Sequence, residues 1–214
     1  MKLVGVYLAA GSSRRMGRAK QSLQMAEGVS LGGMALLQAL HSELACVVVV
    51  VRESDDLAWL PDEARSAIGT GRCRVAVCKD ASLGMAHSLR AGIEVAESLL
   101  ADGALVMLAD QPFVQSAMIG ALIASYRGEA GCDFVASGDQ GMPKPPAILG
   151  RSMWPAVMRL EGDAGARALF HMPAYWGQIE EAADALMFID MDTQGQYEEA
   201  LRIYKNLLAL GKVT

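Results

Sequence analysis

The sequence predicts an α/β fold, in which a doubly wound, mostly parallel sheet lies between two layers of helices in a three-layer α/β/α sandwich. Apolar runs rich in β-branched residues alternate along the chain with stretches whose apolar residues recur at helical spacing. The apolar runs are continuous, as is typical of parallel strands that are covered on both faces. No repeat, linker or low-complexity segment interrupts this pattern, so we expect one domain over residues 1–214.

The apolar runs predict seven strands, in chain order at 2–8, 46–51, 74–77, 104–108, 133–135, 146–149 and 186–189. Helical periodicity predicts seven helices, at 33–41, 56–68, 85–100, 115–126, 152–159, 164–170 and 194–210. One face of the last helix is apolar and carries Tyr197, Leu201, Tyr204, Leu207 and Leu208. We therefore expect this helix to pack on the sheet.

The composition excludes several classes of protein. The net charge is −5 and both signs are mixed along the chain, whereas nucleic-acid binding calls for a basic patch. The four cysteines stand without C-x-x-C pairs, which favours buried thiols in a reducing compartment. Neither a signal peptide nor an apolar run long enough for a bilayer is present, so we expect a cytoplasmic protein without a membrane segment.

The loop after the first strand carries the sharpest signal for function. In a doubly wound sheet, ligands bind beyond the carboxyl ends of the strands. Gly11 lets backbone N–H groups approach an anion, and four cations follow within seven residues, at Arg14, Arg15, Arg18 and Lys20. Directed donors and positive charge are what a triphosphate needs. We expect the nucleotide to contact Leu8, Ala9, Ala10, Gly11, Ser12, Ser13, Arg15 and Lys20.

Two common glycine loops do not fit this segment. A Walker A motif requires Gly-Lys-Ser/Thr, but Gly17 is followed by Arg18. The dinucleotide fingerprint requires a second glycine where Ser13 stands. A glycine turn with a solvated basic face is the alternative interpretation of the loop.

Acidic residues follow two other predicted strands. Asp110, in Asp110-Gln111-Pro112, comes after the strand at 104–108, and its alternative role is to cap the next helix. Asp190 and Asp192 follow the strand at 186–189, where extended alternation would point both carboxylates the same way. Together with Asp110 they could hold Mg²⁺, which prefers one or two protein carboxylates. Either of the two could instead cap the last helix, and the residues do not decide which one binds metal.

A helix start opened by glycine follows the third strand. Gly84, Met85 and Ser88 could receive a base or a ribose at the exposed N–H groups of the first turn. An ordinary helix N-terminus is the alternative. His87 lies in the same turn, where a partly exposed helix histidine is favoured over a ligand contact.

Taken together and in order, these elements resemble the MobA-like nucleotidyltransferases, in particular the molybdenum cofactor cytidylyltransferase and purine-catabolism accessory branch. The segments that carry the resemblance run over nearly the whole chain. They are Leu8-Ala9-Ala10-Gly11 with Arg15-Met16-Gly17 and Lys20, Gly84-Met85 with Ser88-Leu89 and Gly92, Asp110-Gln111-Pro112, Gly162-Asp163-Ala164-Gly165-Ala166-Arg167, and Asp190-Met191-Asp192-Thr193.

The resemblance implies the Rossmann-like fold of nucleotide-diphospho-sugar transferases, with Mg²⁺ held by Asp110 and Asp190 or Asp192. It also implies transfer of a nucleoside monophosphate onto molybdopterin or its molybdenum form, with release of pyrophosphate, in maturation of a molybdenum hydroxylase. Arg15, Lys20 and Asp110 would be the catalytic residues. Ala9-Ala10-Gly11, in place of Leu-Ala-Gly-Gly, is the form associated with CTP over GTP.

The acceptor is the least determined part of this interpretation. Many members of the family have a His-Pro pair where this chain has 142–149 without a histidine, and Pro146-Ala147-Ile148-Leu149 is closer to a variant from purine and selenium-linked hydroxylase maturation. One alternative is a transferase of the same fold that acts on a sugar phosphate or on methylerythritol phosphate. Another is a non-catalytic factor that delivers the cofactor to its client enzyme.

Overall fold

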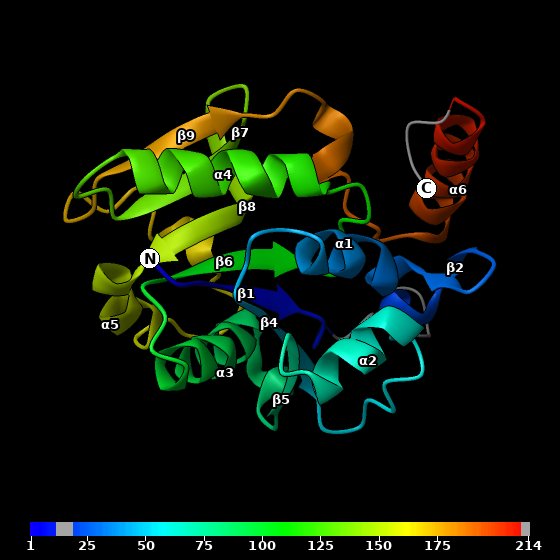
Figure 1. Ribbon diagram of the computed structural model, residues 1–214, viewed down its shortest axis with the longest axis horizontal. Helices are drawn as coiled ribbons and strands as arrows, with labels where there is room; N and C mark the ends of the chain where they lie inside the picture. Colours follow the sequence, from blue (N-terminus) through cyan, green and yellow to red (C-terminus); the bar gives the residue numbers. More distant parts are fainter. Residues whose placement is uncertain (12–18, 211–214) are drawn as a thin grey trace.

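The computed structural model describes residues 1–11 and 19–210, and its centre is a seven-stranded sheet with helices on both faces (Figure 1). The strand order is β5-β4-β1-β6-β8-β7-β9. Their bounds are β1 Leu3–Leu8, β4 Cys46–Arg52, β5 Cys73–Cys78, β6 Gly103–Leu108, β7 Phe134–Asp139, β8 Met142–Gly150 and β9 Gly177–Glu181. Only β8 runs against its neighbours, so the mostly parallel α/β sheet expected from the sequence is confirmed.

The helices form two layers because successive residues of a strand point to opposite faces. From β1, Tyr7 packs with the layer of α1 (Leu31–Leu40), α2 (Asp62–Gly69) and α4 (Ser116–Gly128). Val6 packs on the other face, with α3 (Met85–Ser98) and α5 (Trp154–Val157). Burial of β1 and β4 on both faces explains why their sequences are continuous apolar runs.

Six of the seven expected strands are present, and the prediction of the seventh, at 186–189, is wrong. Residues Ala185–Phe188 form a 3₁₀ helix, whose first turn is capped by the carboxylate of Asp184 accepting from the N–H of Leu186 at 2.9 Å. The last strand is β9 instead, and it was missed because this edge strand is mostly polar and has no buried residue. A short hairpin of β2 (Gln24–Ala26) and β3 (Val29–Ser30) was also missed.

The expected helices are present with shifts, except that 164–170 holds only one 3₁₀ turn, Ala166–Ala168. The helix expected at 56–68 begins six residues late, because Pro61 occupies the N-cap of α2. The stretch 152–159 contains the 3₁₀ turn Arg151–Met153 and the four-residue α5. Among the helices of the described chain, none combines the length and apolar character that a membrane span requires.

The last helix, α6 (Gln194–Ala209), does not pack on the sheet as expected. Figure 1 shows it to one side, beyond the carboxyl ends of β1 and β6. Its apolar face packs with the β2–β3 hairpin and the start of α1, in a cluster with Leu23, Met25 and Leu31. The hydroxyl of Tyr197 donates to the carbonyl of Gln24 at 2.6 Å, which ties α6 to β2. The amphipathic pattern was interpreted correctly as a buried face, but it does not specify which partner covers that face.

Replacing Tyr197 with Phe tests this attachment. Loss of a half-buried hydrogen bond should lower the free energy of unfolding by about 1 kcal/mol. Because the bond holds one peripheral helix, amide exchange should accelerate chiefly in α6. Tyr204→Phe is the matched control, since within the described residues its hydroxyl makes no hydrogen bond. Equal effects of the two substitutions would contradict the assigned role.

Candidate functional site

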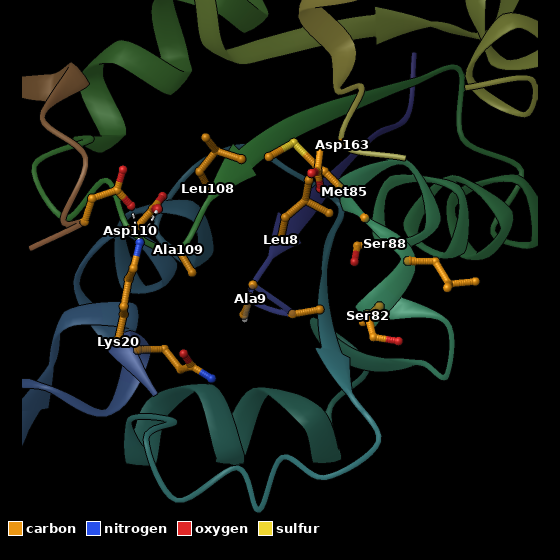
Figure 2. A pocket seen from close by; sticks show the side chains of 17 residues that line it. Leu8, Ala9, Lys20, Ser82, Met85, Ser88, Leu108, Ala109, Asp110 and Asp163 are labelled. Atoms are coloured by element: carbon orange, nitrogen blue, oxygen red, sulfur yellow. Dashed lines mark hydrogen bonds and ion pairs between the residues drawn. The ribbon is translucent and has the colours of Figure 1, made fainter. Parts of the chain in front are cut away.

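A cavity of about 420 Å³ opens beyond the carboxyl ends of β1 and β6 (Figure 2). This is the edge of the sheet at which the sequence placed the ligand. The cavity is lined by Leu8, Ala9, Ala10, Gly11, Lys20, Gln21, Ala81, Ser82, Leu83, Gly84, Met85, Ser88, Leu108, Ala109, Asp110, Asp163 and Asp192. Of the expected site residues that are described, all but Asp190 line it.

The segment after β1 forms the floor of the cavity. Ala9 and Ala10 are buried, and the N–H of Ala9 donates to the carbonyl of Val50 at 2.8 Å, which continues the sheet pairing by one residue. The guanidinium of Arg52 donates to the carbonyl of Ala10 at 3.1 Å and also to that of Gly11. Arg52 was missed in the sequence, although a charged residue at the end of an apolar strand is a usable signal.

Part of the predicted anion loop lies outside the described residues. Ser12, Ser13 and Arg15 belong to that part, as do Arg14 and Arg18. Their expected contacts with a nucleotide therefore stay predictions.

Lys20 joins two acidic segments that are far apart in the sequence. Its ammonium lies 3.5 Å from a carboxylate oxygen of Asp110 and forms a closer ion pair with Asp192. Figure 2 shows Lys20 and Asp110 at one side of the cavity. Burial, followed by the charge of Asp190, raises the pKa of the Asp110 carboxyl, and the Lys20 ammonium offsets this only in part.

The side chains of Asp190 and Asp192 have different surroundings. The intervening Met191 is fully buried, and its N–H donates to the carbonyl of Asp110 at 3.1 Å. Asp192 lines the cavity, whereas Asp190 accepts a hydrogen bond of 3.0 Å from the side-chain amide of Gln111. The alternative role of capping α6 belongs to neither, because Thr193 is the N-cap.

The predicted metal set of Asp110, Asp190 and Asp192 is not a preformed cluster. In the part of the chain that the structure describes, no three His, Cys, Asp or Glu side chains are grouped closely enough to hold a metal ion. Among the described residues, the Lys20 ammonium is a cation that lies near Asp110 and Asp192. These two carboxylates face the cavity, so they are the better candidates for a metal that enters together with a ligand.

The opposite wall of the cavity is the start of α3. Gly84, Met85 and Ser88 line it as expected, with Ser82 and Leu83 from the preceding turn. His87 does not line the cavity, and its Nδ1 lies 3.0 Å from the guanidinium of Arg90, which favours the helix-histidine interpretation.

Several lining residues were missed in the sequence. Asp163 is the charged one among them, and its signal was its position between small residues in 162–166. A second hollow of about 340 Å³ adjoins the first and shares Ala10, Ala81 and Ser82 with it. It lies past the ends of β4 and β5, and its other lining residues are Arg52, Glu53, Ser54 and Lys79.

Comparison with known proteins agrees with this geometry. The model of the MobA-like NTP transferase domain matches residues 5–181, which is most of the chain and includes both walls of the cavity. The chain belongs to this family. The match thus runs from within β1 to the end of β9, while α6 and Asp192 lie beyond the matched residues.

Two curated relatives cover almost the whole chain. The purine catabolism protein PucB of Bacillus subtilis (strain 168) is 37% identical over 202 residues, covering 94% of this chain and 96% of PucB. The nicotine blue oxidoreductase of Paenarthrobacter nicotinovorans is 29% identical over 201 residues, covering 91% of this chain and 94% of that protein. One name refers to purine catabolism and the other to an oxidoreductase, so similarity alone transfers neither role to this member of the family.

Solved structures share the fold. The homologue of Mycobacterium tuberculosis Rv0371c from Mycobacterium sp. strain JC1 has a TM-score of 0.78 and 25% identity, covering 97% of this chain and all of that one. The manganese complex of Rv0371C from Mycobacterium tuberculosis H37Rv has a TM-score of 0.70 and 22% identity, covering 94% of this chain and 99% of that one.

Replacing Asp110 with Asn should stabilise the ligand-free protein at neutral pH. A carboxyl whose pKa is raised by folding destabilises the native state at pH values above that pKa, and this cost disappears below its ordinary value of about 4. The variant should therefore melt higher than wild type at pH 7 in metal-free buffer, and the difference should shrink as the pH falls. Glu94→Gln, at an exposed position on α3, is the control. A lower melting temperature for Asp110→Asn at pH 7 would contradict the assignment.

Proposed function

We propose that this protein is a Mg²⁺-dependent nucleotidyltransferase that moves CMP from CTP onto the phosphate of a molybdopterin-type acceptor. The product would be used in the maturation of a molybdenum hydroxylase, which is the client enzyme. One observation carries the proposal: Lys20 lies between Asp110 and Asp192 at one side of a cavity whose floor is the family's Leu8–Gly11 segment.

The carboxylates of Asp110 and Asp192 suit a divalent cation. Mg²⁺ takes one or two protein carboxylates and completes its shell with water and phosphate oxygens. A positive group, the Lys20 ammonium, already interacts with both carboxylates, so the place favours a cation. The related Rv0371C was solved as a manganese complex, which supports a divalent metal in this fold. When bound, Mg²⁺ would supply charge neutralisation at the phosphates.

The chemistry is a displacement at the α-phosphorus of the nucleotide. An oxygen of the acceptor phosphate bonds to this phosphorus, and the bond from phosphorus to the oxygen bridging the β-phosphate breaks, so that pyrophosphate leaves with its electron pair. The acceptor phosphate is already ionised at neutral pH, so no protein base has to remove a proton. Catalysis would rest on positioning and on charge stabilisation.

Two cations are assigned to the leaving pyrophosphate. Lys20 projects into the cavity from the turn Lys20–Ser22, and its ammonium can move from the carboxylates to phosphate oxygens. Arg15 is assigned the same role from the family motif, with the amides of Gly11, Ser12 and Ser13 as further donors. The nucleoside would reach Gly84, Met85 and Ser88 or the adjoining hollow, which all border the same space.

Replacing Lys20 with Ala, or Asp110 with Asn, should lower the rate of pyrophosphate release by about 10²- to 10³-fold, because each removes one electrostatic contact to the transferring group. The assay is pyrophosphate release with CTP, Mg²⁺ and molybdopterin. Lys205→Ala, at an exposed position of α6, should keep the wild-type rate.

Nearly full turnover of the Lys20 and Asp110 variants would show that these roles are wrong. A panel of other phosphate acceptors, including a sugar 1-phosphate and methylerythritol phosphate, belongs in the same assay. Faster release with one of them would identify the alternative acceptor class.

The nucleotide should be CTP rather than GTP or ATP. Ala10 lines both the main cavity and the hollow beyond β4 and β5. A methyl group at this position, where a glycine would leave more room, would suit a pyrimidine base better than a purine base. Pyrophosphate release should therefore be fastest with CTP, and Ala10→Gly should reduce the preference over GTP. In calorimetry, Mg²⁺ should strengthen CTP binding.

A wild-type preference for GTP would rule out the cytidylyl assignment. Nucleotide binding that does not depend on metal would instead favour a non-catalytic delivery factor, because a carrier has no use for a metal and pyrophosphate site.

A further inference from the structure

Arg52, at the end of β4, is bonded to the floor of the cavity without lining the cavity itself. Its guanidinium donates to the carbonyl of Ala10 at 3.1 Å and also to the carbonyl of Gly11. Arg52 lines the adjoining hollow, whereas Gly11 lines the main cavity and not the hollow. A side chain from the neighbouring strand thus holds two successive carbonyls of the Leu8–Gly11 segment, and the proposed transfer assigns it no role.

These bonds determine the direction of the N–H of Gly11. A peptide unit is planar and trans, so the C=O of Ala10 and the N–H of Gly11 point in opposite directions. Because the carbonyl points at Arg52, the N–H points away from Arg52, on the side of the cavity that Gly11 lines. Gly11 is exposed, and within the described residues no group accepts a hydrogen bond from its N–H. This donor is therefore open to an anion in the cavity.

The charge of Arg52 strengthens the same donor. A guanidinium is always ionised in proteins, and hydrogen bonds from an ionised donor are stronger than those between neutral groups. A carbonyl that accepts such a bond is polarised, which makes the N–H of its own peptide unit a better donor. The Nε of Arg52 is buried and has no hydrogen-bond partner among the described residues. The guanidinium thus keeps an orientation that bonds the two carbonyls and leaves Nε unsatisfied.

We propose that Arg52 is a positioning residue for phosphate binding. It holds the carbonyls of Ala10 and Gly11 toward β4, so that the N–H of Gly11 faces the phosphates of the nucleotide. This proposal rests on the proposed function for the identity of the anion. Arg52 acts through the peptide units and does not contact the nucleotide. Without it, the segment can rotate and present carbonyl oxygens, which repel a phosphate.

Direct contact between Arg52 and the nucleotide is the competing interpretation, because Arg52 lines a hollow of about 340 Å³ beside the cavity. The two interpretations differ in the part of CTP that they affect. A positioning role changes the affinity for the triphosphate, whereas contact with the base changes the affinity for cytidine. A role in stability alone changes neither affinity.

The test compares wild type with Arg52→Ala. The matched control is Arg74→Ala, which removes the same charge at an exposed position of β5 that lines neither space. Affinities for CTP and inorganic triphosphate are measured by calorimetry with Mg²⁺, and that for cytidine by NMR titration. The amide signal of Gly11 is followed in protein labelled with ¹⁵N-glycine. Its assignment comes from Gly11→Ala, where an added Cβ has no atom within 4 Å.

For Arg52→Ala we expect about 10- to 100-fold weaker binding of both CTP and triphosphate, with cytidine binding as in wild type. The amide signal of Gly11 should shift, because the carbonyl of its own peptide unit loses a charged donor. Methylguanidinium, at a concentration too low to unfold the protein, should restore part of the triphosphate affinity and move the signal back. Arg74→Ala should match wild type in every measurement.

Unchanged triphosphate affinity, or an unchanged Gly11 signal, would overturn the role of Arg52. Loss of cytidine affinity would place Arg52 at the base, and an equal loss of triphosphate affinity in Arg74→Ala would reveal a general effect of charge. If Arg52→Ala does not fold, Arg52→Lys takes its place, with the same changes expected at smaller size. Wild-type behaviour of that variant would count equally against the proposal.

Failure of the proposed function has a different signature. In that case wild type would release no pyrophosphate from CTP with any acceptor, whereas the triphosphate affinity and the Gly11 signal would still report directly on Arg52.

Discussion

One ammonium group, the Nζ of Lys20, is the charge on which the arrangement of this site depends. It interacts with Asp110 and Asp192, two carboxylates that are 82 residues apart in the sequence. Asp110 is largely desolvated, so burial opposes its ionisation, and the negative charge of Asp190 adds to that cost. The carboxylates of Asp110 and Asp192 therefore need a nearby cation to lie close together in their ionised form. Lys20 meets this condition in the ligand-free chain. Under the proposed function, a metal ion bound with phosphates would meet it instead.

Two hydrogen bonds to backbone carbonyls help to bring Lys20, Asp110 and Asp192 together. Asp110 follows β6 directly, and the N–H of Met191 donates to its carbonyl, so that the segment containing Asp192 is held beside the end of the sheet. On the other side, the bond from Tyr197 to Gln24 joins α6 to the hairpin that follows Lys20. The cluster of α6 and the β2–β3 hairpin thus joins the segment that follows Lys20 to the helix that follows Asp192.

The opposite wall is built by a different principle. In the part of the chain that the structure describes, no ion pair holds this wall, and a loop approaches the start of α3 so closely that Gly84 has to be glycine. The result is a cavity with a charged side, formed by Lys20, Asp110 and Asp192, and a side on which Asp163 stands without a partner among the described residues.

The sequence by itself determined the sheet and the place of the site. Continuous apolar runs specify strands covered on both faces, and residues at the ends of such strands meet at one edge, so Ala9, Gly84 and Asp110 could be assigned to one cavity. Local sequence patterns failed to predict an element where its packing partner is distant in the sequence. The polar edge strand β9 forms because β7 offers it a ladder of hydrogen bonds, and α6 buries its apolar face against a hairpin that the pattern did not reveal. Tertiary contacts likewise decided that Asp190 and Asp192 have different surroundings and that Asp163 lines the cavity. Burial and the close approach of two backbone segments are properties of the assembled fold, so residue spacing does not encode them.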